Sequence, residues 1–224
     1  MNGLLVIGGA CAVLDWIAVG AGRRRMELLT KPATMLVLLA WFTLGIPSPW
    51  PALGTWFAAG LALSLIGDIF LLYSERWFVY GLGAFLLAQA AYVVALNSEG
   101  VILSARSGVA ALAIAALSFC LYAILREALS RTGNFRMMIP LGVYLAAIGL
   151  MMWSAACATL RPGWPALARG ALAIGGGLFY GSDSILAWNR FVHPFQGARI
   201  LTRLTYHLAQ FGLAVGVSIV LSAA

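Results

Sequence analysis

Three carboxylates lie inside apolar stretches of the sequence: Asp15, Asp68 and Asp183. A charged side chain at mid-bilayer costs about 2.5 to 3.5 kcal/mol on insertion scales, so each of them needs a partner or a function. Two carboxyl groups that share a buried site can keep one of the pair protonated at neutral pH, which suits acid and base chemistry. Asp68 and Asp183 are the candidate catalytic residues, because each also falls in a short motif of the sequence. Asp15 is interpreted as structural, because buried Asp and Arg or Lys pairs also hold helices together.

Several hydrogen-bonding residues in the last apolar stretch share one helix face. Arg203, His207 and Gln210 stand at i, i+4 and i+7, and Tyr206 is adjacent to them. Such side chains can bind a substrate, orient water or a carboxylate, or join one helix to another. The candidate substrate-binding residues of the whole chain are Lys31, Tyr144, Arg203, Tyr206, His207 and Gln210.

The composition indicates which elements must position these residues. The chain has 224 residues, of which 62% are hydrophobic and 9% are charged, and its mean hydropathy is +0.95. Soluble domains carry about 25% charged residues, so we expect the solvent to be a bilayer. Because a helix needs about 20 apolar residues to span the hydrocarbon, little of the chain remains for loops. The sequence predicts an all-α membrane protein, a single multi-pass domain over residues 1–224 with about eight transmembrane helices.

Apolar runs bounded by charges, glycine or proline define the predicted spans. Eleven basic residues fall on one side of the resulting bundle and three on the other. The positive-inside rule assigns the first side to the cytoplasm, so both termini are predicted to be non-cytoplasmic. The spans are expected near 3–22, 32–46, 52–73, 77–96, 106–125, 137–159, 166–187 and 200–222.

Because successive spans cross the membrane in alternating directions, the polar residues come to lie at one level of the membrane. Asp68 lies about five residues before the cytoplasmic end of the third span, which is roughly 8 Å at 1.5 Å per residue. Asp183 has a similar depth in the seventh span, and Lys31 and Arg203 lie near the cytoplasmic ends of theirs. We therefore expect a polar pocket that opens to the cytoplasmic leaflet.

Other classes of function lack the residues that they need. The 14 Lys and Arg against 7 Asp and Glu are interpreted as topology signals and as contacts with anionic headgroups, and no nucleic-acid partner is predicted. No Gly-rich phosphate loop, CxxC pair or HExxH occurs, and the chain has only two histidines, His193 and His207. The sequence thus predicts neither a metal site nor a cofactor.

Short motifs follow one another in a fixed order along the spans: Lys31-Pro32, Gly67–Leu72, Phe78–Tyr92, Pro140 with Tyr144, Ser182–Ala187, and Tyr206 with Gln210. Their joint order and spacing, over about residues 30–212, resemble the YhhN family of membrane proteins, whose characterised members are lysoplasmalogenases. One position departs from the family pattern, because Gln89 stands where members often carry His.

The resemblance implies hydrolysis of the vinyl ether bond of a lysoplasmalogen, which gives a fatty aldehyde and a glycerophospho-ethanolamine or -choline. Protonation at carbon would form an oxocarbenium ion that water captures, with Asp68 and Asp183 as neutral acid and ionised carboxylate, in either order. Lys31 and Arg203 suit the lipid phosphate, or else anchor helix ends by snorkelling. The expected partners are a lysophospholipid and the bilayer of a bacterial inner (cytoplasmic) membrane. A proton-coupled transporter or a lipid-binding scaffold is the alternative, because either would use the same carboxylates.

Overall fold

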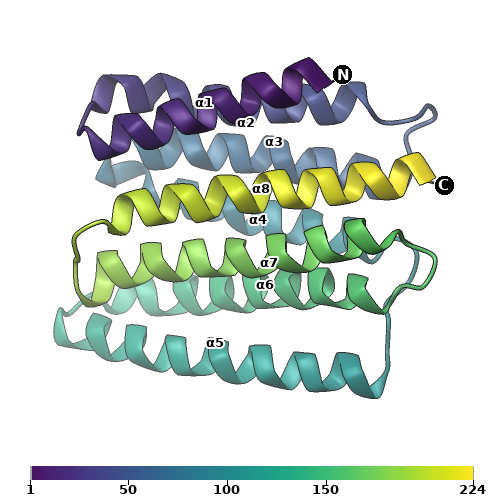
Figure 1. Cartoon of the computed structure of the whole chain (residues 1–224). Helices are drawn as coiled ribbons and strands as arrows, with labels where there is room; N and C mark the ends of the chain where they lie inside the picture. The colour runs from purple at the N-terminus through teal and green to yellow at the C-terminus, as the bar shows by residue number, and fades with distance from the viewer. Residues whose placement is uncertain (1, 224) are drawn as a thin grey trace.

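The computed structural model describes residues 2–223, which form an all-helical bundle with no strand (Figure 1). The predicted fold class is thereby confirmed. Seven of the helices are long and apolar enough to cross a membrane. The remaining one, α7, has 22 residues, but its three successive glycines and its Ser-Asp-Ser segment lower its hydropathy. The helices are α1 (Asn2–Gly20), α2 (Arg24–Leu44), α3 (Ala52–Tyr73), α4 (Phe78–Leu96), α5 (Ala105–Arg131), α6 (Met138–Cys157), α7 (Ala166–Ala187) and α8 (Ala198–Ala223).

The bundle has two chemically different ends. The loops after α1, α3, α5 and α7 lie together at one end in Figure 1, and both termini lie at the opposite end. We call the first the basic end, because its loops and adjoining helix turns carry the eleven basic residues counted above. The helices therefore alternate in direction as the sequence predicts, and the chain ends share one side of the bundle.

Reporter fusions will test which side of the membrane the basic end faces. We expect tags at Met1 and at Ala224 both to report the non-cytoplasmic side, because the positive-inside rule retains the basic end in the cytoplasm. Activity of a periplasm-dependent reporter and of a cytoplasm-dependent reporter at each end measures this. Two tags that report opposite sides would contradict the bundle in Figure 1, and two cytoplasmic tags would contradict the orientation.

Two helices are longer than the apolar runs that predicted them. The expected start of the second span at residue 32 was wrong, because α2 begins at Arg24 and contains Pro32. The charged residues Glu27 and Lys31 are buried in this added segment and are paired with side chains of other helices, so they do not end the helix. The fifth span continues to Arg131 and not to residue 125. Its last turns carry an exposed Glu127–Arg131 ion pair at 2.9 Å, which is compatible with water at the basic end.

Glycines allow α3 and α4 to approach closely at the level of the site. A Cβ atom at Gly60 would lie 2.4 Å from the Tyr92 ring, and one at Gly67 would lie 2.6 Å from the Phe85 ring. The α7–α8 pair uses the same device, because a Cβ at Gly175 would lie 2.9 Å from Leu213. Small residues at such positions let helix backbones come together in a membrane, where packing replaces the hydrophobic effect. The glycines thus fix the spacing of helices that carry the site.

A methyl group at Gly60 should destabilise the protein. Gly60→Ala places a carbon against the rigid Tyr92 ring, and such overpacking typically costs about 1 to 3 kcal/mol. The melting temperature of the purified protein in detergent measures the effect. Gly83→Ala in α4 is the matched control, because no atom lies within 4 Å of its added Cβ and alanine favours the helix. Equal melting temperatures for the two variants would show that α3 and α4 do not pack as closely as described.

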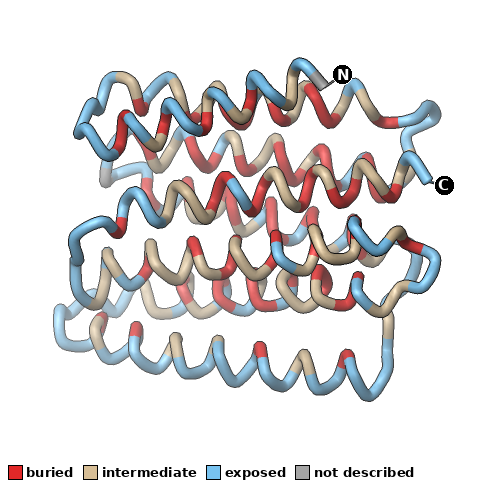
Figure 2. The backbone as a smooth tube through the Cα atoms, viewed as in Figure 1, coloured by how far each residue is buried: buried red, intermediate tan, exposed pale blue. Residues whose placement is uncertain are grey.

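Helix α5 lies at the edge of the bundle, packed mainly against α6. Its principal helix neighbour is α6, and only four of its 27 residues are buried: Ser107, Ile114, Leu125 and Leu129. Figure 2 shows α5 as mostly exposed along its length. The exposed residues include large apolar side chains such as Leu112 and Phe119, which are 73% and 72% exposed. An apolar surface of this kind is suited to contact with lipid.

Candidate active site

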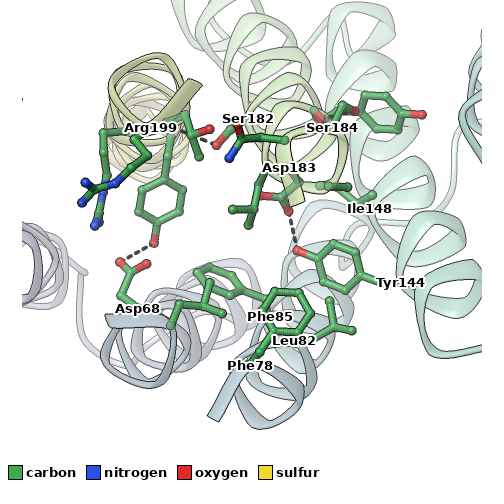
Figure 3. A pocket seen from close by; sticks show the side chains of 18 of the residues that line it. Asp68, Phe78, Leu82, Phe85, Tyr144, Ile148, Ser182, Asp183, Ser184 and Arg199 are labelled. Carbon is green, nitrogen blue, oxygen red and sulfur yellow. Dashed lines mark hydrogen bonds between the residues drawn. The ribbon is translucent and has the colours of Figure 1, made fainter. Parts of the chain in front are cut away.

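A cavity of about 200 Å³ lies toward the basic end, among α2, α3, α4, α6, α7 and α8. Both candidate catalytic residues line it, and they approach it from different helices (Figure 3). Four of the six candidate binding residues line the same cavity, whereas His207 and Gln210 do not. The structure thus brings together Lys31, Asp68, Tyr144, Asp183, Arg203 and Tyr206.

Asp68 is held by a cation and a hydroxyl group. Lys31 Nζ lies 2.6 Å from Asp68 Oδ1, and the Tyr206 hydroxyl donates to Asp68 Oδ2 at 2.8 Å. The aspartate is completely buried, and the lysine is only 7% exposed. An ammonium group in direct contact and a donated hydrogen bond both stabilise the charged form of a carboxyl group. Both contacts therefore favour an ionised Asp68, whereas its complete burial opposes the charge.

A chain of hydrogen bonds extends from Asp68 into the bundle. Gln210 Nε2 donates to the Tyr206 oxygen at 3.2 Å, and the Tyr92 hydroxyl donates to Gln210 Oε1 at 2.9 Å. Ser64 Oγ lies 3.2 Å from the Tyr92 oxygen. Gln210 therefore orients Tyr206 from behind the cavity and has no surface on the cavity itself.

Asp183 has a different environment. The Tyr144 hydroxyl donates to Asp183 Oδ2, and no ion pair to this carboxyl group is found among residues 2–223. Next to it, Ser182 Oγ donates to the Thr202 carbonyl at 3.0 Å and so ties α7 to α8. A carboxyl group without a cation in contact can hold a proton more readily than one in an ion pair. The two aspartates are thus chemically distinct although each is bound by a tyrosine.

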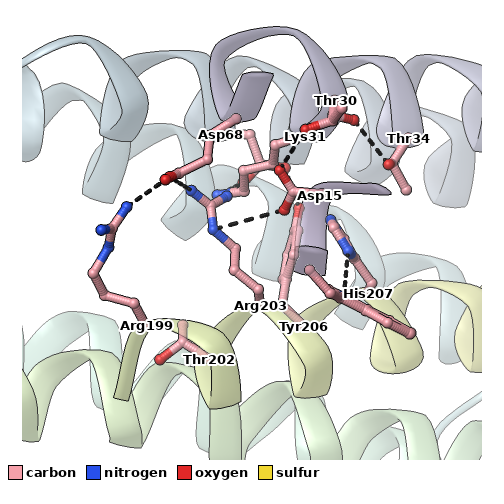
Figure 4. Close-up of polar contacts among 12 residues, drawn as sticks. Asp15, Thr30, Lys31, Thr34, Asp68, Arg199, Thr202, Arg203, Tyr206 and His207 are labelled. Atoms are coloured by element: carbon pink, nitrogen blue, oxygen red, sulfur yellow. Dashed lines mark hydrogen bonds and ion pairs between the residues drawn. The ribbon is translucent and has the colours of Figure 1, made fainter. Parts of the chain in front are cut away.

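Three arginines surround a buried glutamate at the outer part of the cavity. Glu27 Oε2 lies 2.6 Å from Arg199 Nη2, 3.3 Å from Arg24 Nη1 and 3.7 Å from Arg203 Nη2. Arg24 also donates to the Leu72 carbonyl at the end of α3. The three arginines line the cavity, whereas Glu27 does not. We call this group the arginine cluster; Figure 4 shows that two of its members, Arg199 and Arg203, both project from α8.

Sequence reasoning missed Arg24, Arg199 and Glu27 as site residues. It counted the arginines only as topology signals, and it placed Glu27 in a loop before the second span. The i, i+3 spacing of Arg24 and Glu27 was a usable signal for a helix that starts earlier, because such pairs lie on one helix face. No sequence pattern indicated that Arg199 would contribute to the site.

Two predicted polar residues lie away from the cavity, between α1, α2 and α8. Asp15 accepts a hydrogen bond from Thr30 Oγ1 at 2.7 Å and lies 3.9 Å from Arg203 Nε (Figure 4). His207 Nδ1 accepts from Trp16 Nε1 at 3.1 Å. Both residues are completely buried and neither lines the cavity. These contacts fit a role in joining helices.

The wall of the cavity that α4 and α6 form is largely apolar. Side chains from α4 and α6 line the cavity beside the two aspartates, as Figure 3 shows for Phe85, Leu82 and Ile148. A polar cavity wall on one side and an apolar wall on the other suit an amphipathic ligand. The apolar residues from α4 and α6 are Phe78, Leu82, Phe85, Leu141, Leu145 and Ile148.

Gln89, the position that departs from the family pattern, is completely buried in α4. Neither of its polar side-chain atoms has a hydrogen-bond partner among the side chains that the structure describes. Those described side chains also include no group of three His, Cys, Asp or Glu residues that could hold a metal ion.

Comparison with known proteins places this sequence in a family. The sequence profile of the YhhN family matches residues 26–217. The human (Homo sapiens) protein named lysoplasmalogenase TMEM86A is 36% identical over 161 residues, which are 70% of this chain and 62% of that protein. A protein of Mycobacterium bovis named lysoplasmalogenase is 29% identical over 187 residues, 82% of this chain and 67% of the relative. The chain thus spans about three fifths of the length of the human and bovine TMEM86A proteins that it matches. No solved structure matches.

Proposed function

This chain belongs to the YhhN family, and from that premise we propose that it is a membrane-embedded hydrolase of the lysoplasmalogenase type. Its substrate would be a lysoplasmalogen with an ethanolamine or choline headgroup, and its products a fatty aldehyde and the corresponding glycerophosphodiester. Its place would be the inner membrane of a bacterium. The observation that carries the proposal is one cavity in which two aspartates with different partners face an apolar wall.

In the first step Asp183 would act as the general acid. Its neutral carboxyl group gives a proton to the alkenyl carbon that is not bonded to oxygen, which converts the vinyl ether to an oxocarbenium ion. Asp183 suits this role because no cation contacts it, whereas Lys31 keeps Asp68 ionised. The carboxylate of Asp68 in turn stabilises the positive charge that develops on the substrate.

Water would then capture the oxocarbenium ion and complete the cycle. Asp68 accepts a proton from the attacking water, and a hemiacetal forms. When the hemiacetal collapses, its hydroxyl group returns a proton to Asp183, and Asp68 protonates the leaving glycerol oxygen. One water molecule is consumed, the carbon–oxygen bond to the glycerol is broken, and both carboxyl groups return to their initial states. Tyr206 and Tyr144 would hold the two carboxyl groups in position throughout.

An assay of the purified protein tests this proposal. We expect aldehyde to be released from lysoplasmalogens and not from ester lysolipids of the same chain length, because only the vinyl ether gives an oxocarbenium ion on protonation at carbon. Vesicles that contain only this protein provide the contrasting measurement. Proton-coupled uptake without aldehyde release from any lysolipid would contradict the hydrolase and support the transporter alternative.

A further inference from the structure

The arginine cluster presents positively charged groups to the cavity, and Glu27 does not cover them. The side chain of Arg24 is 48% exposed and that of Arg199 is 57% exposed, although both contact the fully enclosed Glu27. Arg203 Nη1 is buried and has no hydrogen-bond partner among residues 2–223. Because Glu27 lies behind the arginines, the charge that neutralises them does not cover their cavity side.

Lys31, the fourth cation of the cavity, has a different environment. Its ammonium group is 2.6 Å from Asp68 and 5.2 Å from the centre of the Tyr206 ring, so it belongs to the catalytic ion pair. Four cations line the cavity, and the three guanidinium groups carry more N–H donors than Glu27 and the Leu72 carbonyl accept from them. Because Lys31 is already paired with Asp68, the arginines are the better candidates to bind a phosphate.

We propose that Arg24, Arg199 and Arg203 form a phosphate-binding subsite at the outer part of the cavity, with Glu27 as the positioning residue that holds the arginines in place. The ligand is the phosphodiester of a lysolipid. Planar guanidinium groups bind phosphate oxygens through paired hydrogen bonds, and such bonds are stronger than neutral ones. The proposal rests on the proposed function, and it adds that this subsite restricts the protein to lysolipids that carry phosphate.

The rest of the cavity fits the same orientation of the lipid. A phosphate on the arginine cluster leaves the chain to lie along the apolar residues of α4 and α6. The glycerol and the bond to be cleaved then fall between these two regions, where Asp68 and Asp183 line the cavity.

A binding measurement tests the subsite without depending on catalysis. The probes are a saturated ether lysolipid, which has the chain and the phosphodiester but no vinyl ether, and the matching alkylglycerol without phosphate. Their dissociation constants for the purified protein are measured by thermal-shift titration. We expect the wild type to prefer the lysolipid, and Arg24→Gln with Arg199→Gln to reduce lysolipid affinity by about 10- to 100-fold, the range for lost hydrogen bonds to charged groups. Affinity for the alkylglycerol should change much less.

The control is Arg25→Gln, which removes a charge from an exposed neighbour of Arg24 that does not line the cavity. This variant should keep the wild-type preference. Competition by inorganic phosphate would support the subsite and show that a free anion can also occupy it, and its absence with the preference intact would assign the site to the lipid alone. A double variant that keeps the preference, or that loses affinity for both probes equally, overturns the subsite. Because neither probe can be cleaved, a failed aldehyde assay would count against the proposed function and leave this result unaffected.

Discussion

Asp183→Asn should abolish aldehyde release while the protein stays folded. Asparagine keeps the size of the side chain and can still accept the hydrogen bond from Tyr144, but it cannot supply a proton to carbon. General acid catalysis typically contributes about 10² to 10⁴ in rate, so the loss should be evident in kcat. The melting temperature should remain near that of the wild type, because no ion pair among the described residues depends on Asp183.

Glu127→Gln is the matched control for this substitution. It makes the same chemical change at an exposed carboxylate on α5, whose ion pair with Arg131 lies in water. Exposed pairs contribute about 0 to 1 kcal/mol, so both turnover and melting temperature should be retained. A well-folded Asp183→Asn protein with near-normal turnover would show that Asp183 is not the general acid.

Asp68→Asn should lose both activity and stability. The substitution leaves the Lys31 ammonium group buried without its counter-ion, and breaking a buried pair in this way costs about 3 to 5 kcal/mol. The free energy of unfolding, followed through the melting temperature in detergent, should fall accordingly. Sequence reasoning treated the two aspartates as equivalent, so this difference between them comes from the structure.

The double substitution Lys31→Met with Asp68→Asn separates the two effects. Removing both charges removes the uncompensated ammonium group, and replacement of a buried pair by uncharged residues is often neutral for stability. We expect most of the melting temperature to return while aldehyde release stays absent. A single Asp68→Asn variant as stable as the wild type would contradict the ion pair, and a double variant with restored turnover would contradict the catalytic role of Asp68.

The sequence predicted the fold well because apolar runs of span length are a strong signal in a membrane protein. The bounds of α3 and α7 agree with the predicted spans 52–73 and 166–187. The depth argument also placed Asp68 and Asp183 at one level, and both line the same cavity, because α3 and α7 run in the same direction and reach the basic end together.

The contacts between the polar side chains could be predicted from the sequence only in part. Hydropathy ends a span at its first charges, so the predicted spans excluded Glu27, Arg24 and Arg199. Which partner each aspartate takes depends on helix rotation, and a shift of one residue turns a side chain by about 100°. The pairing of Lys31 with Asp68 therefore could not be predicted, and neither could the placement of His207 against Trp16.

The position of α5 at the edge of the bundle bears on how the protein adapts to bilayers of different thickness. Its 27 residues extend about 40 Å at 1.5 Å per residue, which exceeds the roughly 30 Å of hydrocarbon in a typical membrane. Such mismatch is relieved by tilting, at a modest cost per ångström. Helix α5 contributes no residue to the cavity lining, but its Tyr122 donates to the Met138 carbonyl of α6 at 3.3 Å, and its Ser118 lies 3.0 Å from the hydroxyl of Tyr180 on α7. A change in lipid chain length that tilts α5 would therefore act first on α6 and α7, the two helices that carry Tyr144 and Asp183.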